Sequence, residues 1–163
     1  MATIPGMPGE ALLIGIATIA VVVAGFTAVT STLTPPGGSW SPQMRVRQRG
    51  IVSTSFNVVF EALAPLILFA WLDDVHSAFV IASAGVALYT AAIVVMRARQ
   101  FLRAGSTRTP STMLLMALGP TACVLFALNA LVFASLAVYA LALCVQMSVA
   151  VISFYSLVSA AQS

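Results

Sequence analysis

The composition of this 163-residue chain excludes an ordinary water-soluble domain. Hydrophobic residues make up 61% of it and charged residues only 7%, whereas a soluble domain carries about a quarter charged residues. A folded core of this size could not hide so much apolar surface from water. The formal net charge of +3 is therefore interpreted by position along a membrane protein, and it does not indicate a nucleic-acid partner.

Three apolar blocks of the chain are each long enough to cross a membrane. A helix needs about 20 apolar residues to span about 30 Å of hydrocarbon, and the blocks cover 11–33, 51–72 and 76–96. A fourth block covers about 111–160, and as one straight helix it would be about 75 Å long. Because that length is more than twice the hydrocarbon thickness, we expect this block to fold back on itself.

The reversal in the fourth block is predicted near Asn129, Ser135 and Tyr139, which are polar residues close to its middle. The chain then forms an all-α polytopic transmembrane bundle, a single integral membrane domain over 1–163. A four-span bundle is the alternative if part of the last block lies in the membrane interface. The five predicted spans cover 11–33, 51–72, 76–96, 111–131 and 136–159.

The charged residues predict the orientation of the bundle. Short arginine-rich connections stay in the cytoplasm, and both such connections fall on one side of a five-span chain. The opposite connection holds Asp73, Asp74 and His76, and Glu10 precedes the first span on that side. We therefore expect the N-terminus outside and the C-terminus in the cytoplasm. Anionic lipid headgroups are the expected counterpart of the arginines, although topology alone would account for them. The arginines are Arg45, Arg47, Arg49, Arg97, Arg99, Arg103 and Arg108.

The first 70 residues contain two further informative segments. The leading stretch "MATIPGMPGEALL" has no positive region and no obvious cleavage site, so we expect the first span to remain in the protein. The segment "ATIAVVVAGFTAV", followed after the basic connection by "GIVSTSFNVVFEALAPLIL", resembles a loose group of small, uncharacterised bacterial inner-membrane proteins. That group shows an AGF-type motif in the first span and an acid or proline in the second. The resemblance implies a multi-pass protein of the bacterial inner membrane and no particular activity.

A carboxylate lies in the middle of the second predicted span. Glu61 is central in 51–72, where a charged side chain costs about 2.5–3.5 kcal/mol on insertion scales. Thr54, Asn57, Glu61 and Pro65 recur at intervals of three or four and so share one helix face. Pro65 lacks a backbone N–H, and its ring crowds the carbonyl group of Glu61, so we expect a helix kink beside the carboxyl group.

Other spans offer partners for Glu61 at a similar depth. Gln146 is near the middle of the fifth span, and Tyr89 with Thr90 near the middle of the third. We predict a buried cluster of Glu61, Asn57, Gln146 and Tyr89. One interpretation is that a protonated Glu61 acts as a hydrogen-bonding group that specifies helix packing. The other is an ion, proton or polar-ligand site.

A second pair of helix-breaking residues, Gly119 and Pro120, lies in the fourth span. We expect them to interrupt that span and to let the helix bend. The kinks at Pro65 and at this pair would allow helices to move during transport.

The acidic connection could hold a divalent cation at the membrane surface. Asp73, Asp74 and His76 are suitable ligands. We favour a solvated loop that caps the second span and starts the third, and we expect neither a bound metal nor a cofactor.

The inventory of reactive side chains does not favour an enzyme. The one histidine cannot supply paired axial imidazoles for haem, and no HExxH motif is present. Glu61 has no second intramembrane acid, and the serines of the last span have no base beside them. We therefore expect a channel or transporter, assembled as a homo-oligomer because five spans are few to enclose a pathway. The alternative is a non-transporting accessory or scaffold subunit that packs against another membrane protein.

Overall fold

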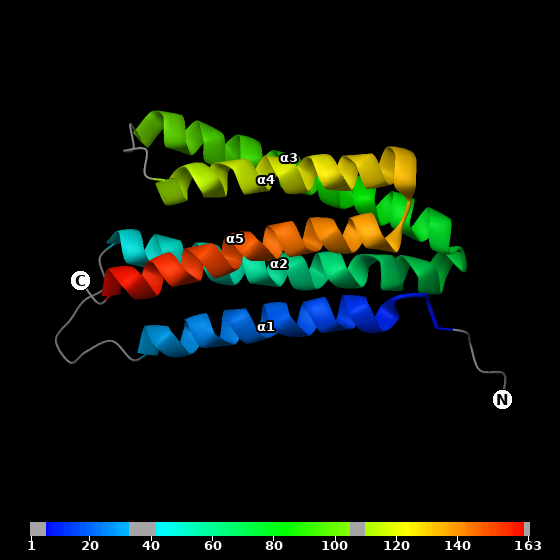
Figure 1. Cartoon of the computed structure of the whole chain (residues 1–163), viewed down its shortest axis with the longest axis horizontal. Coiled ribbons are helices and arrows are strands. Elements are labelled where there is room, and N and C mark those ends of the chain that lie inside the picture. Colours follow the sequence, from blue (N-terminus) through cyan, green and yellow to red (C-terminus); the bar gives the residue numbers. More distant parts are fainter. Residues whose placement is uncertain (1–5, 33–41, 105–109, 162–163) are drawn as a thin grey trace.

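Five long helices form the structure, a computed structural model that describes residues 6–32, 42–104 and 110–161 (Figure 1). The described residues contain no strand, which confirms the predicted all-α class. A short π-helix, η1, continues α4 before the chain turns into α5. The elements are α1 (Glu10–Thr32), α2 (Pro42–Leu72), α3 (Val75–Ala104), α4 (Pro110–Leu128), η1 (Asn129–Phe133) and α5 (Leu136–Ala161).

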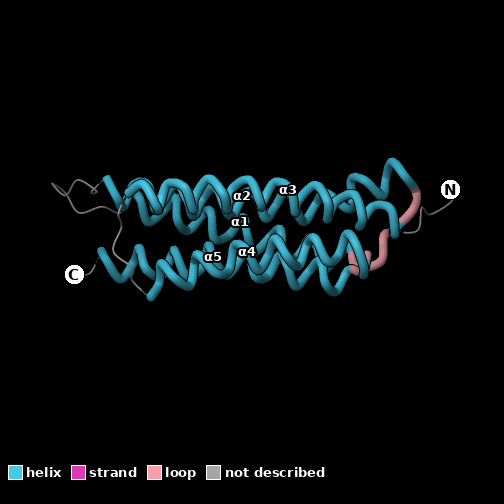
Figure 2. Tube along the Cα trace, turned by 90° about the horizontal axis from the view of Figure 1, so that it is seen from above, coloured by secondary structure: helices cyan, strands magenta, loops and turns pink. Residues whose placement is uncertain are grey.

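Successive helices run in opposite directions, so the helix ends and connections gather at two ends of the bundle (Figures 1 and 2). These two ends differ in charge. The start of α1 and the α2–α3 turn lie at one end, which we call the acidic end because it carries Glu10, Asp73 and Asp74. The starts of α2 and α4 and the ends of α3 and α5 lie at the other end. We call it the basic end, since it carries the arginines of α2 and α3.

The helices at the basic end extend beyond the apolar spans. The arginines of 42–50 and 97–104, which the sequence predicts in connections, lie on the first turns of α2 and the last turns of α3. Pro42 suits the first helical position, where its missing N–H has no intrahelical role, and arginine, glutamine and methionine are good helix formers. Arg108 lies outside the described residues, as do the side chains of Arg45, Arg47, Arg97 and Arg103.

Helices α2, α3, α4 and α5 form a ring in which each contacts the next, and α1 packs from outside against α2 and α5 (Figure 1). The buried residues of α1 include Leu13, Ile16, Ala17, Ala20 and Ala24, which follow the helical repeat of one face. The alanines let the backbone of α1 approach its neighbours closely, as small residues do between membrane helices.

The outer surface of the bundle is apolar over most of its length. In a soluble protein, helices of this kind would present polar residues to the outside, but here large hydrophobic side chains are exposed on every helix. Examples are Leu12, Phe26, Phe60, Trp71, Leu88, Leu131 and Tyr155. Four segments are long and apolar enough to cross a bilayer, namely Glu10–Val29, Gln48–Leu72, Val75–Met96 and Leu136–Ser156. The chain is therefore an integral membrane protein built as a helix bundle.

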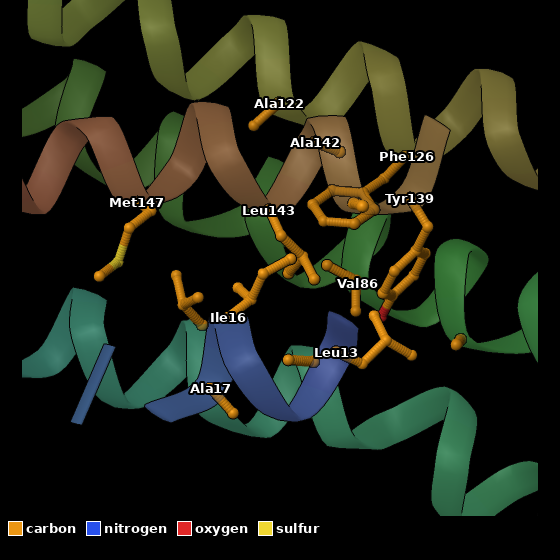
Figure 3. Packing of buried hydrophobic residues seen from close by; sticks show 14 of the residues in the cluster. Leu13, Ile16, Ala17, Val86, Ala122, Phe126, Tyr139, Ala142, Leu143 and Met147 are labelled. Carbon is orange, nitrogen blue, oxygen red and sulfur yellow. The ribbon is translucent and has the colours of Figure 1, made fainter. Parts of the chain in front are cut away.

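Three aromatic rings fill the half of the ring that is nearer the acidic end. Phe79 of α3 and Phe126 of α4 each meet Tyr139 of α5 edge to face, with ring centroids 5.6 and 5.2 Å apart. None of the three is more than 1% exposed. Figure 3 shows Phe126 and Tyr139 together in the core with Leu13 and Leu143. We call Phe79, Phe126 and Tyr139 the aromatic cluster.

The reversal between α4 and α5 is held by Asn129, which is fully buried. Its Nδ2 donates to the hydroxyl of Ser83 on α3 at 2.8 Å, and its Oδ1 accepts the backbone N–H of Ser135 at 2.9 Å. Its carbonyl accepts the N–H of Ala134, whose φ of 43° turns the chain. The predicted reversal thus occurs at 129–135, and one side chain ties it to a third helix.

Candidate functional site

Glu61 lies near the middle of the α2 span and is only 5% exposed. Arg49, on the same helix, is three turns away, which corresponds to about 18 Å along the axis. No arginine on α2 can therefore reach the carboxyl group to neutralise it. Glu61 must be satisfied by polar groups of the neighbouring helices.

One carboxyl oxygen of Glu61 is bonded to Gln146 across the bundle. The Gln146 side-chain amide donates from Nε2 to Oε1 of Glu61 at 3.0 Å, which joins α2 to α5. The other oxygen, Oε2, and the amide oxygen Oε1 of Gln146 are buried and have no hydrogen-bond partner among the described residues. A buried acceptor without a donor costs about 1–3 kcal/mol, so this pair has capacity for a further ligand.

The backbone carbonyl of Glu61 has its own donor. Pro65, four residues later, cannot supply the usual helical N–H, and α2 continues through it. The hydroxyl of Tyr139 on α5 donates to this carbonyl at 2.6 Å. Tyr139 is not among the residues predicted from the sequence for this site. A signal was present, because the carbonyl that a mid-span proline leaves without its N–H partner requires a donor from another helix.

Asn57 and Tyr89 form a separate pair one turn away from Glu61 on α2. The hydroxyl of Tyr89 donates to Oδ1 of Asn57 at 3.1 Å. Tyr89 is 48% exposed, so this pair lies toward the outside of the bundle. The four residues that the sequence predicted as one cluster are thus arranged as two bonded pairs, each joining α2 to another helix.

A groove of about 280 Å³ lies between α2 and α3 beside this second pair. Asn57, Glu61, Tyr89, Phe60 and Gly85 contribute to its walls. A Cβ atom at Gly85 would meet no atom of another helix within 4 Å, so the space beside this glycine is open. We call this feature the α2–α3 groove.

A smaller cavity of about 60 Å³ lies inside the ring and is lined by all four of its helices. Its polar lining comes from Thr54, Asn57, Thr90 and Gln146. The hydroxyl of Thr90 is buried and, within the described part of the chain, has no hydrogen-bond partner. We call this feature the four-helix cavity. Asn57 belongs to both the cavity and the groove, and Gln146 connects the cavity to Glu61.

Gly119 and Pro120 lie in the wall of the four-helix cavity. The expectation that they interrupt the fourth span is wrong, because α4 runs continuously from Pro110 to Leu128. A Cβ atom at Gly119 would approach Cγ2 of Val94 to 3.1 Å. The glycine therefore permits close packing of α4 on α3 beside the cavity.

The acidic residues between α2 and α3 have structural roles in the turn. Asp73 ends α2 with a φ of 51°, a conformation that aspartate tolerates better than most residues. Asp74 caps α3, because its Oδ2 accepts the backbone N–H of Ser77 at 2.8 Å. Hydrogen bonds from the Ser77 side chain and backbone hold the pKa of Asp74 below its ordinary value. No group of three or more metal-binding side chains, with or without His76, occurs in the described residues.

Comparisons with known proteins do not assign the site. No protein-family model matches the chain, and searches of curated proteins and of solved structures found no match either. Any function must therefore be inferred from the geometry around Glu61.

Proposed function

We propose that this chain is a small channel or transporter of the bacterial inner membrane, in which Glu61 holds a proton or a small cation. Gln146 orients the carboxyl group through its 3.0 Å hydrogen bond, and Oε2 is the atom that takes the proton or cation. Asn57 and Tyr89 support the site from the α2–α3 groove. The positive-inside rule favours the basic end in the cytoplasm, beside anionic headgroups, and the N-terminus outside.

The observation that carries this proposal is the unpartnered Oε2 of a carboxyl group at mid-span. An acid whose only role is helix packing is expected to have both oxygens bonded, because each unsatisfied atom destabilises the fold. Intramembrane acids commonly mark ion pathways and proton relays. The α2–α3 groove that Glu61 helps to line measures about 280 Å³ and the four-helix cavity about 60 Å³. Both are smaller than the pockets of organic substrates, which measure about 300–1,000 Å³, and this favours a proton or a small cation.

A flux assay in proteoliposomes tests the proposal. The purified protein is reconstituted, and proton, sodium and potassium fluxes are measured under an imposed gradient. We expect Glu61→Gln to lose most of the flux, because the amide cannot take up a proton or balance a cation. Glu10→Gln makes the same chemical change at the exposed start of α1 and should leave the flux unchanged. Absent flux in the unmodified protein, or equal flux in Glu61→Gln, contradicts the proposal.

The second candidate function is a non-transporting accessory or scaffold subunit. It is favoured by the position of the α2–α3 groove, where Tyr89 and Phe60 are 48% and 69% exposed beside the polar Asn57. Polar side chains at this depth are normally covered by protein rather than lipid. A partner helix seated in the groove would cover them. The same surface would serve a homo-oligomer if the partner is a second copy.

Mass measurement in detergent separates these assemblies. A homo-oligomer gives a multiple of the chain mass, and replacing Tyr89 with phenylalanine should weaken it if the groove is the contact. A monomer in detergent that also shows no flux favours the accessory role. A monomer with Glu61-dependent flux excludes both the accessory role and the need for an oligomer.

A further inference from the structure

We infer that the four-helix cavity is a water-filled half-channel that connects Glu61 to the basic end of the protein and not to the acidic end. This inference deepens the proposed function, and it rests on that function for what the water carries. The half-channel itself is a hydrated path on one side of the bilayer midplane.

The depth of the cavity supports the direction of the path. Helix α2 runs from the basic end to the acidic end, so Thr54 and Asn57 lie on the basic side of Glu61. Helices α3 and α5 run the other way, and Thr90 and Val149 lie in the basic halves of their spans. The cavity therefore begins beside Gln146, near mid-span, and extends toward the basic end.

The chemistry of the lining supports hydration. The hydroxyl of Thr90 and the amide oxygen of Gln146 are buried, have no hydrogen-bond partner among the described residues, and belong to residues that line the cavity. A polar cavity holds water when it is large enough and offers polar partners, and one molecule needs about 10–15 Å³ of such space. The volume of about 60 Å³ therefore admits a short chain of water molecules. Water would satisfy both atoms and reach the amide that is bonded to Glu61.

The other half of the ring is sealed by apolar packing. The aromatic cluster of Phe79, Phe126 and Tyr139 fills the space between Glu61 and the acidic end. The hydroxyl of Tyr139 already donates to the Glu61 carbonyl at 2.6 Å, so it has no proton left to donate to a water chain. All three rings are at most 1% exposed, so apolar side chains pack on the acidic side of Glu61. The four-helix cavity therefore lies on the basic side of Glu61, and the aromatic cluster lies on its acidic side.

Silver-ion accessibility tests the half-channel. Single cysteines are introduced at Thr90 and Val149 in a chain whose native Cys123 and Cys144, both free thiols, are replaced by alanine. Sealed vesicles of each orientation receive Ag⁺ on one face and a thiol scavenger on the other. Blocking is then measured as the loss of maleimide labelling after the protein is unfolded in detergent.

The control positions lie on the same two helices but in the acidic half. Ala82 on α3 and Ala142 on α5 are buried in the core, and each accepts a cysteine with a small change in volume. We expect Ag⁺ from the basic face to block Thr90→Cys and Val149→Cys nearly completely, and Ag⁺ from the acidic face to leave them labelled. Ala82→Cys and Ala142→Cys should stay labelled in both cases. If Thr90→Cys does not fold, Val149→Cys alone decides.

The half-channel is overturned if the cavity cysteines are protected from both faces or are blocked equally from the acidic face. These outcomes do not depend on transport. Blocking from the basic face without Glu61-dependent flux would leave the half-channel standing and remove the transport proposal. Glu61-dependent flux with protected cavity cysteines would support the transport proposal and remove the half-channel.

Discussion

The hydroxyl of Tyr139 donates a 2.6 Å hydrogen bond to the backbone carbonyl of Glu61. This carbonyl would normally accept the N–H of residue 65, which is a proline and has none. Tyr139 thereby replaces the hydrogen bond that the α2 backbone lacks at Glu61, and the side chain of the same glutamate is bonded to Gln146. The backbone and side chain of Glu61 are both held by α5, so any movement of α5 against α2 changes the environment of the carboxyl group.

Replacing Tyr139 with phenylalanine should destabilise the protein by about 1 kcal/mol, because the buried Glu61 carbonyl loses its donor while the ring packing is kept. Equilibrium unfolding in mixed detergent micelles measures the change. Tyr155→Phe is the matched control, since Tyr155 is on the same helix and is 74% exposed. Equal stability of the two variants would show that the hydrogen bond contributes nothing.

Removing the side chain of Asn129 should have a larger effect. Asn129→Ala leaves the Ser83 hydroxyl and the Ser135 N–H without their partner, and we expect a loss of about 2–3 kcal/mol in unfolding free energy. A double-mutant cycle with Ser83→Ala isolates the contact between α4 and α3. A coupling energy of zero in that cycle would contradict the assignment of Asn129 as the tie between the reversal and α3.

Asp74 should make stability depend on pH at the acidic end. Its pKa is lowered in the folded protein by hydrogen bonds from Ser77, so its stabilising effect is present at neutral pH and is lost as the pH falls through that lowered value. Asp74→Ala should therefore lower Tm at neutral pH, and the difference from the unmodified protein should shrink as the pH is lowered through the depressed pKa of Asp74. Asp73→Asn serves as the control, because asparagine tolerates the same positive φ. A difference in Tm that is constant with pH would contradict the capping role of the charged form.

Labelling with a membrane-impermeant maleimide should establish the orientation. In a chain without its native cysteines, Arg99→Cys is expected to react from the cytoplasm and His76→Cys from outside, because arginine-rich segments stay in the cytoplasm. Both positions are exposed at opposite ends of the bundle. Reaction of both from one side would contradict the bundle topology, and the reversed pattern would contradict the proposed orientation.

The elements around the site differ in how far the sequence predicted them. The existence of a reversal in the last apolar block followed from its length, because a 50-residue helix is too long for a single crossing of the bilayer. Its position at 129–135 followed from the polar residues Asn129 and Ser135 near the middle of the block. The central depth of Glu61 followed in the same way from the limits of its span. The continuity of α4 through Pro120 did not follow, since the effect of a proline depends on neighbouring helices that can satisfy the freed backbone groups.

Hydropathy and charge along the chain by themselves determined the class of protein and the gathering of arginines at one end, and they left a choice between five spans and four. These properties depend on how each segment partitions between water and lipid, which is local to the segment. The tertiary structure alone decided that Gln146 and Tyr139 meet Glu61, that Asn57 pairs with Tyr89 on the outer side, and that Thr90 faces a cavity. The physical reason is that helices apolar on all sides have no amphipathic stripe to fix their rotation. Their facing surfaces are selected by close packing and by the few polar groups that must find partners.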